Sequence, residues 1–137
     1  MKTAGYSGVS LAKKLGIKSG FKIKLINHPD YYYALFTDFP TDVTEIKDQK
    51  IKKDFIHYFA FNTVQLDKDI KQLRNEMEEK GMIWVSWYKK SAKMHTNLSD
   101  DIIRKIALAH GLVDVKVCAI DELWSGLKFV IRVNDRK

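Results

Sequence analysis

The sequence has one cysteine, two prolines and no long apolar run, and each shortage narrows the class of protein it can encode. A lone Cys118 excludes an internal disulfide and suits a reducing cytosol. The longest apolar stretches have about seven residues, whereas a helix that crosses a bilayer needs about 20. The N-terminal segment lacks the apolar centre of a signal peptide. We therefore expect a cytoplasmic protein without a membrane partner.

The chain also lacks internal repeats, low-complexity segments and linkers rich in proline, glycine or serine. Its length of 137 residues and its hydrophobic content of 45% suit one ordinary globular domain with a real core. We expect a single α/β domain over residues 1–137.

Acidic residues are absent from the first 24 positions, although the chain as a whole carries a formal net charge of +7. This segment holds six lysines: Lys2, Lys13, Lys14, Lys18, Lys22 and Lys24. Such a region attracts anions and could bind nucleic acid by releasing counterions. No arginine stands there, and arginine is the better bidentate reader of phosphate. We therefore favour the simpler alternative, a solvated helix face followed by a tail.

Alternating strand and helix patterns run along the whole chain. Turn residues and apolar runs predict strands at 21–26, 43–46, 55–61, 82–88, 113–121 and 126–133. A helix is expected at 10–16, a second at 28–36 after the first-turn Pro29, and a third that carries Leu66, Ile70, Leu73 and Met77 and stops at Gly81. A fourth should start at the N-cap Ser99 and end near Gly111. This order predicts a three-layer α/β sandwich with a mostly parallel, Rossmann-like sheet of about six strands and a C-terminal antiparallel hairpin.

Three quoted stretches carry a resemblance to known proteins. "GYSGVSLAKKLGIK", "WVSWYKKS" and "GLVDVKVCAIDELWSGLKFV" resemble a family of small bacterial proteins that is classed as a domain of unknown function. "KLGIKSGFKIKLI", "LRNEMEEKGMIWVSW" and the terminal hairpin resemble, more distantly, a truncated Rossmann-like methyltransferase dependent on S-adenosylmethionine. The methyltransferase resemblance implies the strand order 2-1-3-4-6-5 with the final strand antiparallel.

The chain departs from the methyltransferases where their cofactor binds. Their loop after the first strand is rich in glycine, which lets the backbone approach the cofactor closely. Here the loop reads "NHPDYYY", residues 27–33, without a glycine and with Pro29 in place of an amide donor. Glu45 or Asp48 stands where an acid could hold a ribose, but a lone acid after a weak strand is common. We expect no cofactor.

The best candidate site lies where the strand at 82–88 ends in charge. Lys89, Lys90 and Ser91 follow it directly, with Lys93 and His95 beyond, and the turn of the terminal hairpin should bring Asp121, Glu122, Trp124 and Ser125 to the same edge. Together they could hold an anionic ligand or stack a base. The alternative, which we favour, is a set of surface salt bridges between these lysines and acids over a tryptophan that caps the core.

A second candidate lies at the switch point of the predicted sheet, where a crevice should open between Asn27–His28 and Asn62–Thr63. Their polar side chains could bind a small molecule, and His28 could transfer a proton. The alternative is that they cap strand ends and the start of a helix.

The remaining reactive residue types favour structural roles. His57 lies among phenylalanines, as a neutral core histidine does, and Cys118 has no basic neighbour that marks it as a nucleophile. The four histidines lack metal-ligand spacing, so we predict no metal site. Of the consecutive Tyr31, Tyr32 and Tyr33, one or two should pack inward.

Three functions fit these observations. We prefer a non-catalytic domain that binds a protein partner or a small anion on a methyltransferase-like scaffold. The alternatives are an enzyme that acts on a small anionic substrate held by Lys89 and Lys90, and a nucleic-acid binder that uses the lysine-rich N-terminal region.

Overall fold

Residues 9–136, which the computed structural model describes, form a six-stranded sheet with helices on both faces. The strands are β1 (Lys22–Ile26), β2 (Thr44–Glu45), β3 (Lys53–Phe59), β4 (Met77–Tyr88), β5 (Leu112–Ala119) and β6 (Trp124–Ile131). The helices are α1 (Leu11–Leu15), α2 (Thr63–Asn75) and α3 (Asp100–Ala109). Short 3₁₀ turns lie at Tyr32–Leu35, Lys90–Ala92 and Val133–Asp135.

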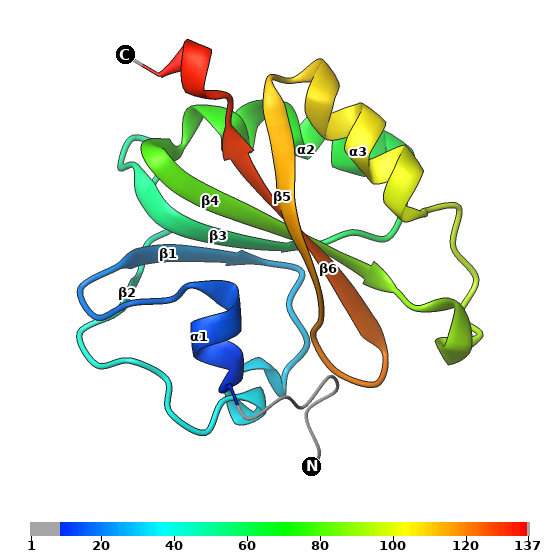
Figure 1. Cartoon of the computed structure of the whole chain (residues 1–137), viewed down its shortest axis with the longest axis horizontal. Helices are drawn as coiled ribbons and strands as arrows, with labels where there is room; N and C mark the ends of the chain where they lie inside the picture. The colour runs from blue at the N-terminus through cyan, green and yellow to red at the C-terminus, as the bar shows by residue number, and fades with distance from the viewer. Residues whose placement is uncertain (1–8, 137) are drawn as a thin grey trace.

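The strands lie in the order β2-β1-β3-β4-β6-β5 (Figure 1). β2, β1, β3 and β4 are mutually parallel, and β6 runs antiparallel to both of its neighbours, β4 and β5. This confirms the predicted α/β class, the strand order and the antiparallel final strand. After β1 the chain continues to β2 on one side, and after β3 it continues to β4 on the other side. The connections that follow β1 and β3 therefore lie on opposite faces of the sheet.

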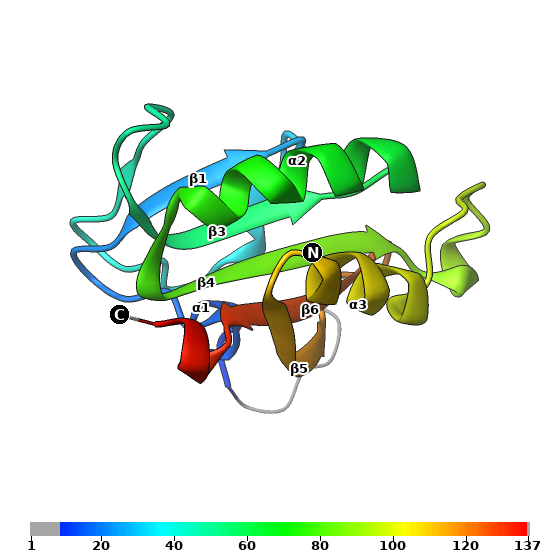
Figure 2. The same ribbon diagram turned by 90° about the horizontal axis from the view of Figure 1, so that it is seen from above.

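Two hydrophobic cores lie on the two faces of the sheet. α2 and α3 cover one face, and in Figure 2 they lie in front of the sheet with α1 behind it. The second core packs α1 and the turn Tyr32–Leu35 on the other face, together with the tip of the β5–β6 hairpin. The layers therefore follow the predicted three-layer arrangement.

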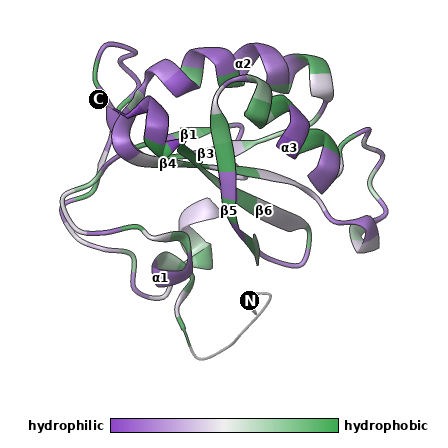
Figure 3. Cartoon of the chain, turned by 45° about the horizontal axis from the view of Figure 1, so that its top comes forward, coloured by the Kyte–Doolittle hydropathy of each residue, from purple (hydrophilic) through white to green (hydrophobic). Residues whose placement is uncertain are grey.

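The buried positions repeat as the sequence pattern predicts. In β1, Ile23 and Leu25 are buried on one face while Lys24 points to the other, as expected for a period of two. In α2, Leu66 and Ile70 form an apolar stripe, and hydrophilic residues line its outer face (Figure 3). Ser99 caps α3 by accepting a hydrogen bond from the amide of Ile102.

Two predicted elements differ from the structure. The helix expected at 28–36 is a single 3₁₀ turn, because only Tyr32 and Leu35 are buried and this i, i+3 pair suits the tighter turn. The third predicted helix was wrong at its end, because α2 stops at Asn75 and Met77 already begins β4. Gly81 is therefore not a helix stop.

Gly81 lies inside β4 at an irregularity in its pairing with β3. A Cβ added at Gly81 would lie 2.9 Å from the carbonyl oxygen of Lys53 and 3.0 Å from that of Glu78. Both atoms are backbone, so neither can move aside cheaply. The glycine that reads as a helix terminator is thus required by the close approach of two strands.

Candidate functional site at the carboxyl edge of the sheet

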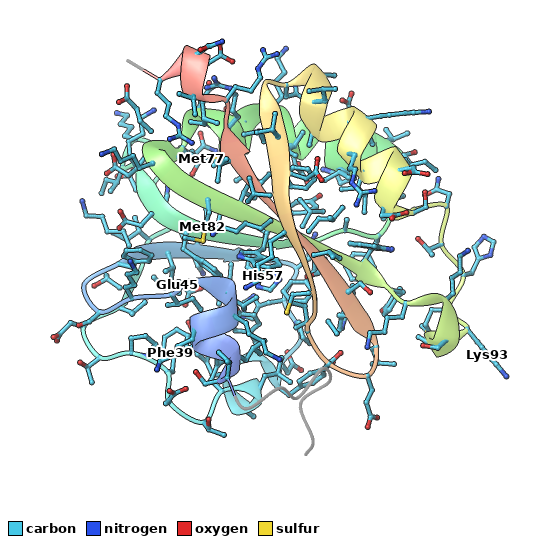
Figure 4. The ribbon with its side chains drawn as sticks, in the orientation of Figure 1. Phe39, Glu45, His57, Met77, Met82 and Lys93 are labelled. Atoms are coloured by element: carbon cyan, nitrogen blue, oxygen red, sulfur yellow. The ribbon has the colours of Figure 1, made fainter. Side chains whose placement is uncertain are left out.

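The carboxyl ends of β1, β3 and β4 meet the tip of the β5–β6 hairpin at one edge of the sheet. The amide of Lys89 donates to the carbonyl of Leu123 over 2.8 Å, which joins the segment after β4 to the hairpin turn. The structure therefore brings together the two segments that carry the first candidate site. Lys93, which follows them, points away from the body of the protein (Figure 4).

A hollow of about 440 Å³ lies beside Lys89 and Lys90. Its walls come from the end of β4, the following loop and the N-terminus of α3, and include Tyr88, Leu98, Ser99 and Ser125. Asp100, in the first turn of α3, adds a carboxylate. Ser91 lies in the adjacent 3₁₀ turn, where it is exposed and does not line the hollow.

Among residues 9–136, the acids of the hairpin turn do not form the salt bridges with Lys89 and Lys90 that the sequence favoured. Asp121 is buried, and its carboxylate accepts hydrogen bonds from the amides of Leu123 and Trp124 and from the Tyr31 hydroxyl, the last over 2.8 Å. Burial and the contact with Asp121 raise the pKa of Tyr31 to about 12. Glu122 is exposed. Within residues 9–136 no ion pair joins Lys89 or Lys90 to either acid, so Asp121 holds the turn.

Trp124 caps the core and is not an open stacking surface. It is 3% exposed, and its ring stacks on Tyr88 with centroids 4.2 Å apart. Phe59 and Phe61 approach it edge-on. Phe61 is the exposed member of this aromatic group, with 46% of its surface accessible.

Most side chains of the second candidate site form hydrogen bonds within the protein. Asn27 adopts a left-handed conformation with φ of 58°, and its side chain donates to the carbonyl of Phe59. Asn62 caps α2 by accepting from the amide of Gln65, and Thr63 accepts from Asn97. These contacts match the alternative in which such residues cap strand and helix ends. His28 contacts the ring of Tyr32 edge-on, with centroids 5.8 Å apart.

A chain of buried polar side chains runs over β3 and β4 on the face of the sheet that α1 covers, just below this edge. The Tyr32 hydroxyl is hydrogen-bonded to Nδ1 of His57 over 2.9 Å, and Nε2 of His57 is hydrogen-bonded to Ser86 over 2.8 Å. All three residues have 0% exposure. Figure 4 shows His57 near the centre of the molecule. Burial, with a smaller effect of His28, lowers the pKa of His57 to about 3, so the ring is neutral.

The Tyr32–His57–Ser86 chain is the feature that sequence reasoning missed. His57 was expected to be a neutral core histidine, and its burial confirms that part. "YYY" predicts that one or two tyrosines pack inward, but the sequence does not say which, because that depends on the 3₁₀ turn. Tyr32 is buried, whereas Tyr33 is 44% exposed and donates to Glu45.

Metal sites and membrane spans are two further features that the sequence bears on. No group of three or more histidine, cysteine, aspartate or glutamate side chains among residues 9–136 could hold a metal ion. None of the helices in this part of the chain is long and apolar enough to span a membrane. Cys118 is half-buried, and burial raises the pKa of its thiol.

Comparison with known proteins bears on the fold. No family model and no curated protein matches the chain. Among solved structures, a protein assigned as a type 11 methyltransferase from Sulfolobus solfataricus is similar over 91% of both chains, with a TM-score of 0.64 and 12% identity. A SAM-dependent methyltransferase from Aquifex aeolicus is similar over 88% of both chains, with a TM-score of 0.57 and 12% identity.

A third similar structure contains a cofactor product. It is the magnesium protoporphyrin IX methyltransferase of Synechocystis PCC 6803 with bound S-adenosylhomocysteine, at a TM-score of 0.57 and 11% identity over 88% of this chain and 78% of that one. At such identities the likeness concerns the fold alone. Together with the strand order and the antiparallel β6, it shows that the chain has the Rossmann-like fold of the S-adenosylmethionine-dependent methyltransferases.

Proposed function

We propose that this protein is a non-catalytic binding domain that keeps a methyltransferase-like scaffold and does not use S-adenosylmethionine. The observation that supports this most directly is the buried ring of Tyr32, which packs at the carboxyl end of β1 and is fixed by its hydrogen bond to His57. In the methyltransferases that the sequence resembles, a glycine-rich loop follows this strand. Here a bulky side chain and its partner fill the space instead.

The backbone after β1 is also poorly suited to a cofactor. Pro29 has no amide hydrogen, and the amides of Tyr32, Ala34 and Phe36 are used in 3₁₀-type hydrogen bonds within the turn. Glu45 ends β2, where a ribose-binding acid would be expected, but its carboxylate accepts a hydrogen bond from Tyr33. These amides and this carboxylate therefore already have partners in the protein.

Thermal unfolding with excess S-adenosylhomocysteine tests this proposal. We expect no change in the unfolding midpoint. A ligand at about 100 times its dissociation constant stabilises a protein by roughly 2.7 kcal/mol, which for this size is a rise of several degrees. A catalytically active methyltransferase measured in parallel controls for ligand quality. A rise of several degrees would contradict the proposal and make a methyltransferase the leading hypothesis.

The hollow beside Lys89 and Lys90 is the proposed binding site. Lys89 and Lys90 line it next to the N-terminus of α3, whose backbone favours negative charge, and the carboxylate of Asp100 there is paired with Arg104. The same geometry supports the second candidate, an enzyme that acts on a small anionic substrate. A binding domain requires a partner or ligand that co-purifies, whereas an enzyme requires turnover. A lone cysteine suits a cytoplasmic setting for either.

Replacing Lys90 with alanine should separate a binding role from a structural one. Lys90 is exposed, so Lys90→Ala should change the free energy of unfolding by less than about 0.5 kcal/mol. We expect it to weaken binding of small anions, tested with inorganic phosphate and a panel of di- and tricarboxylates by isothermal titration calorimetry. Lys105→Ala, also exposed but on α3, is the matched control. Equal affinities for the wild type and Lys90→Ala would remove this hollow from the proposal.

A further inference from the structure

Lysines from three separate segments of the chain lie together around the end of α1. Lys14 belongs to α1, Lys116 to β5 and Lys128 to β6. Lys116 and Lys128 are direct register partners on neighbouring antiparallel strands. The ammonium group of Lys116 donates to the carbonyl of Lys14 over 3.0 Å, which joins β5 to the end of the helix. Only the N-terminal lysines form a cluster in the sequence, because Lys116 and Lys128 join them through strand pairing.

A hollow of about 390 Å³ opens between α1 and β5 among these lysines. Lys13, Lys14 and Lys116 line it, together with Val117 and Cys118. None of the described residues that line it is acidic or aromatic. It is distinct from the hollow beside Lys90, with which it shares no lining residue.

Repulsion among these lysines destabilises the folded protein when no anion is bound. Like charges directly opposite each other on paired strands are destabilising. Burial, and then the charges of Lys116 and Lys18, lower the pKa of Lys128. Within residues 9–136 no ion pair joins an acid to Lys13, Lys18, Lys116 or Lys128. Asp38 lines a second hollow beside α1 with Lys13 and Lys18.

We propose that this lysine cluster, formed by Lys13, Lys14, Lys18, Lys116 and Lys128, binds a small ligand that carries a chain of phosphate groups. Lys13, Lys14 and Lys116 line the hollow, and Lys18 and Lys128 lie beside it around the end of α1. Such a spread of ammonium groups matches several phosphates better than it matches one carboxylate. The hollow has the volume of a small-molecule site. Without arginine or an aromatic side chain in its walls, it offers neither the rigid planar fork of a guanidinium group nor a surface for stacking a base. These features favour a compact polyphosphate group over an extended nucleic acid.

Calorimetric titration with inorganic tripolyphosphate tests the proposal at low and at physiological ionic strength. We expect saturable binding that weakens as salt rises. The double variant Lys116→Gln/Lys128→Gln should bind at least about tenfold more weakly, which corresponds to about 1.4 kcal/mol. The control Lys71→Gln/Lys105→Gln removes the same charge from exposed positions on α2 and α3 and should change the affinity less than about twofold.

Cys118 supplies a second readout, because it is the sole cysteine and lines the hollow. Bound tripolyphosphate should slow its alkylation by iodoacetamide in the wild type, measured by mass spectrometry at constant ionic strength, and should not do so in the double variant. Unchanged or higher thermal midpoints would show that the double variant is folded.

Three results would overturn the proposal: no saturable binding at millimolar tripolyphosphate, equal weakening by both double variants, or binding of a short DNA duplex that tripolyphosphate does not displace. The last result would favour an extended nucleic-acid surface. Because this site is separate from the carboxyl edge, none of these outcomes depends on whether S-adenosylhomocysteine binds.

Discussion

Acidification from pH 8 to pH 5 is expected to lower the free energy of unfolding by about 2 kcal/mol through His57 alone. Burial lowers the pKa of His57 to about 3 in the folded protein, against 6.5 for the ordinary side chain. Between these values the unfolded chain binds a proton that the folded chain does not. The stabilisation is therefore complete above pH 6.5 and is lost as the pH falls toward 3. Equilibrium urea unfolding at several pH values measures it.

Between pH 6.5 and pH 5, the pH dependence of the unfolding free energy reports on His57 and not on the buried carboxylate of Glu76. Glu76, whose pKa is lowered overall in the fold, contributes a pH dependence only below its ordinary value of 4.5. In His57→Gln the unfolding free energy should be smaller at pH 8 and should fall less steeply toward pH 5. His95→Gln, which alters an exposed ring, is the control and should keep the wild-type slope.

Nuclear magnetic resonance provides a check that does not require a variant to fold. The ring nitrogens of His57 should keep the chemical shifts of a neutral imidazole down to pH 5. In that form one nitrogen carries the hydrogen and donates, and the other accepts. Titration of His57 with a midpoint near 6.5 would contradict the buried Tyr32–His57–Ser86 chain. That result would also weaken the proposed function, since the chain is what holds Tyr32 in place.

The alternation of buried and exposed residues was the feature of the fold that the sequence predicted best. Ile23 and Leu25 in β1, and the stripe of Leu66 and Ile70 in α2, fix which face of each element is buried. Once the faces are set, short connections and right-handed crossovers leave few topologies. The pattern therefore predicted an α/β sandwich with a mostly parallel sheet, whereas the exact strand order came from the resemblance to the methyltransferases.

The boundary between α2 and β4 could not be predicted from the sequence, because "MEEKG" fits the end of a helix as well as the start of a strand. Met77 continues the helical stripe, and Glu78 and Glu79 are good helix formers. In the structure Met77 pairs with Lys53, and the amide of Lys53 donates to the carbonyl of Glu76. A long-range strand pairing therefore ends the helix, and no local signal reports it.

For a similar reason, some residues of the candidate sites could be placed from the sequence and others could not. Lys89 and Lys90 could be placed at the sheet edge, because strand ends follow from local patterns. The pairing of Lys116 with Lys128 depends on the register of two strands, and the burial of Asp121 depends on a turn that places its carboxylate against Tyr31. Contacts of this kind arise only when distant segments meet.

A buried ion pair makes Glu76→Gln the substitution with the largest expected cost, about 3–5 kcal/mol in the free energy of unfolding. Lys53 and Glu76 are joined over 2.7 Å, and both side chains have 0% exposure. Lys24 reaches the same carboxylate over 2.9 Å. Burial alone would raise the pKa of Glu76, but the hydrogen bonds from Lys53 and Lys24 lower it overall, so the carboxylate is charged. Glutamine preserves the shape and leaves Lys53 as a buried charge without an anion.

A variant that lacks both charges separates the cost of that orphaned charge from the value of the pair. Lys53→Met/Glu76→Leu removes both charges and should recover most of the stability that Glu76→Gln loses, because replacing a buried ion pair by apolar side chains is often neutral. Glu122→Gln, at an exposed carboxylate, should cost less than about 0.5 kcal/mol. If Glu76→Gln were as mild as Glu122→Gln, Lys53 would have to reach water, and the closed packing between β3 and the end of α2 would be wrong.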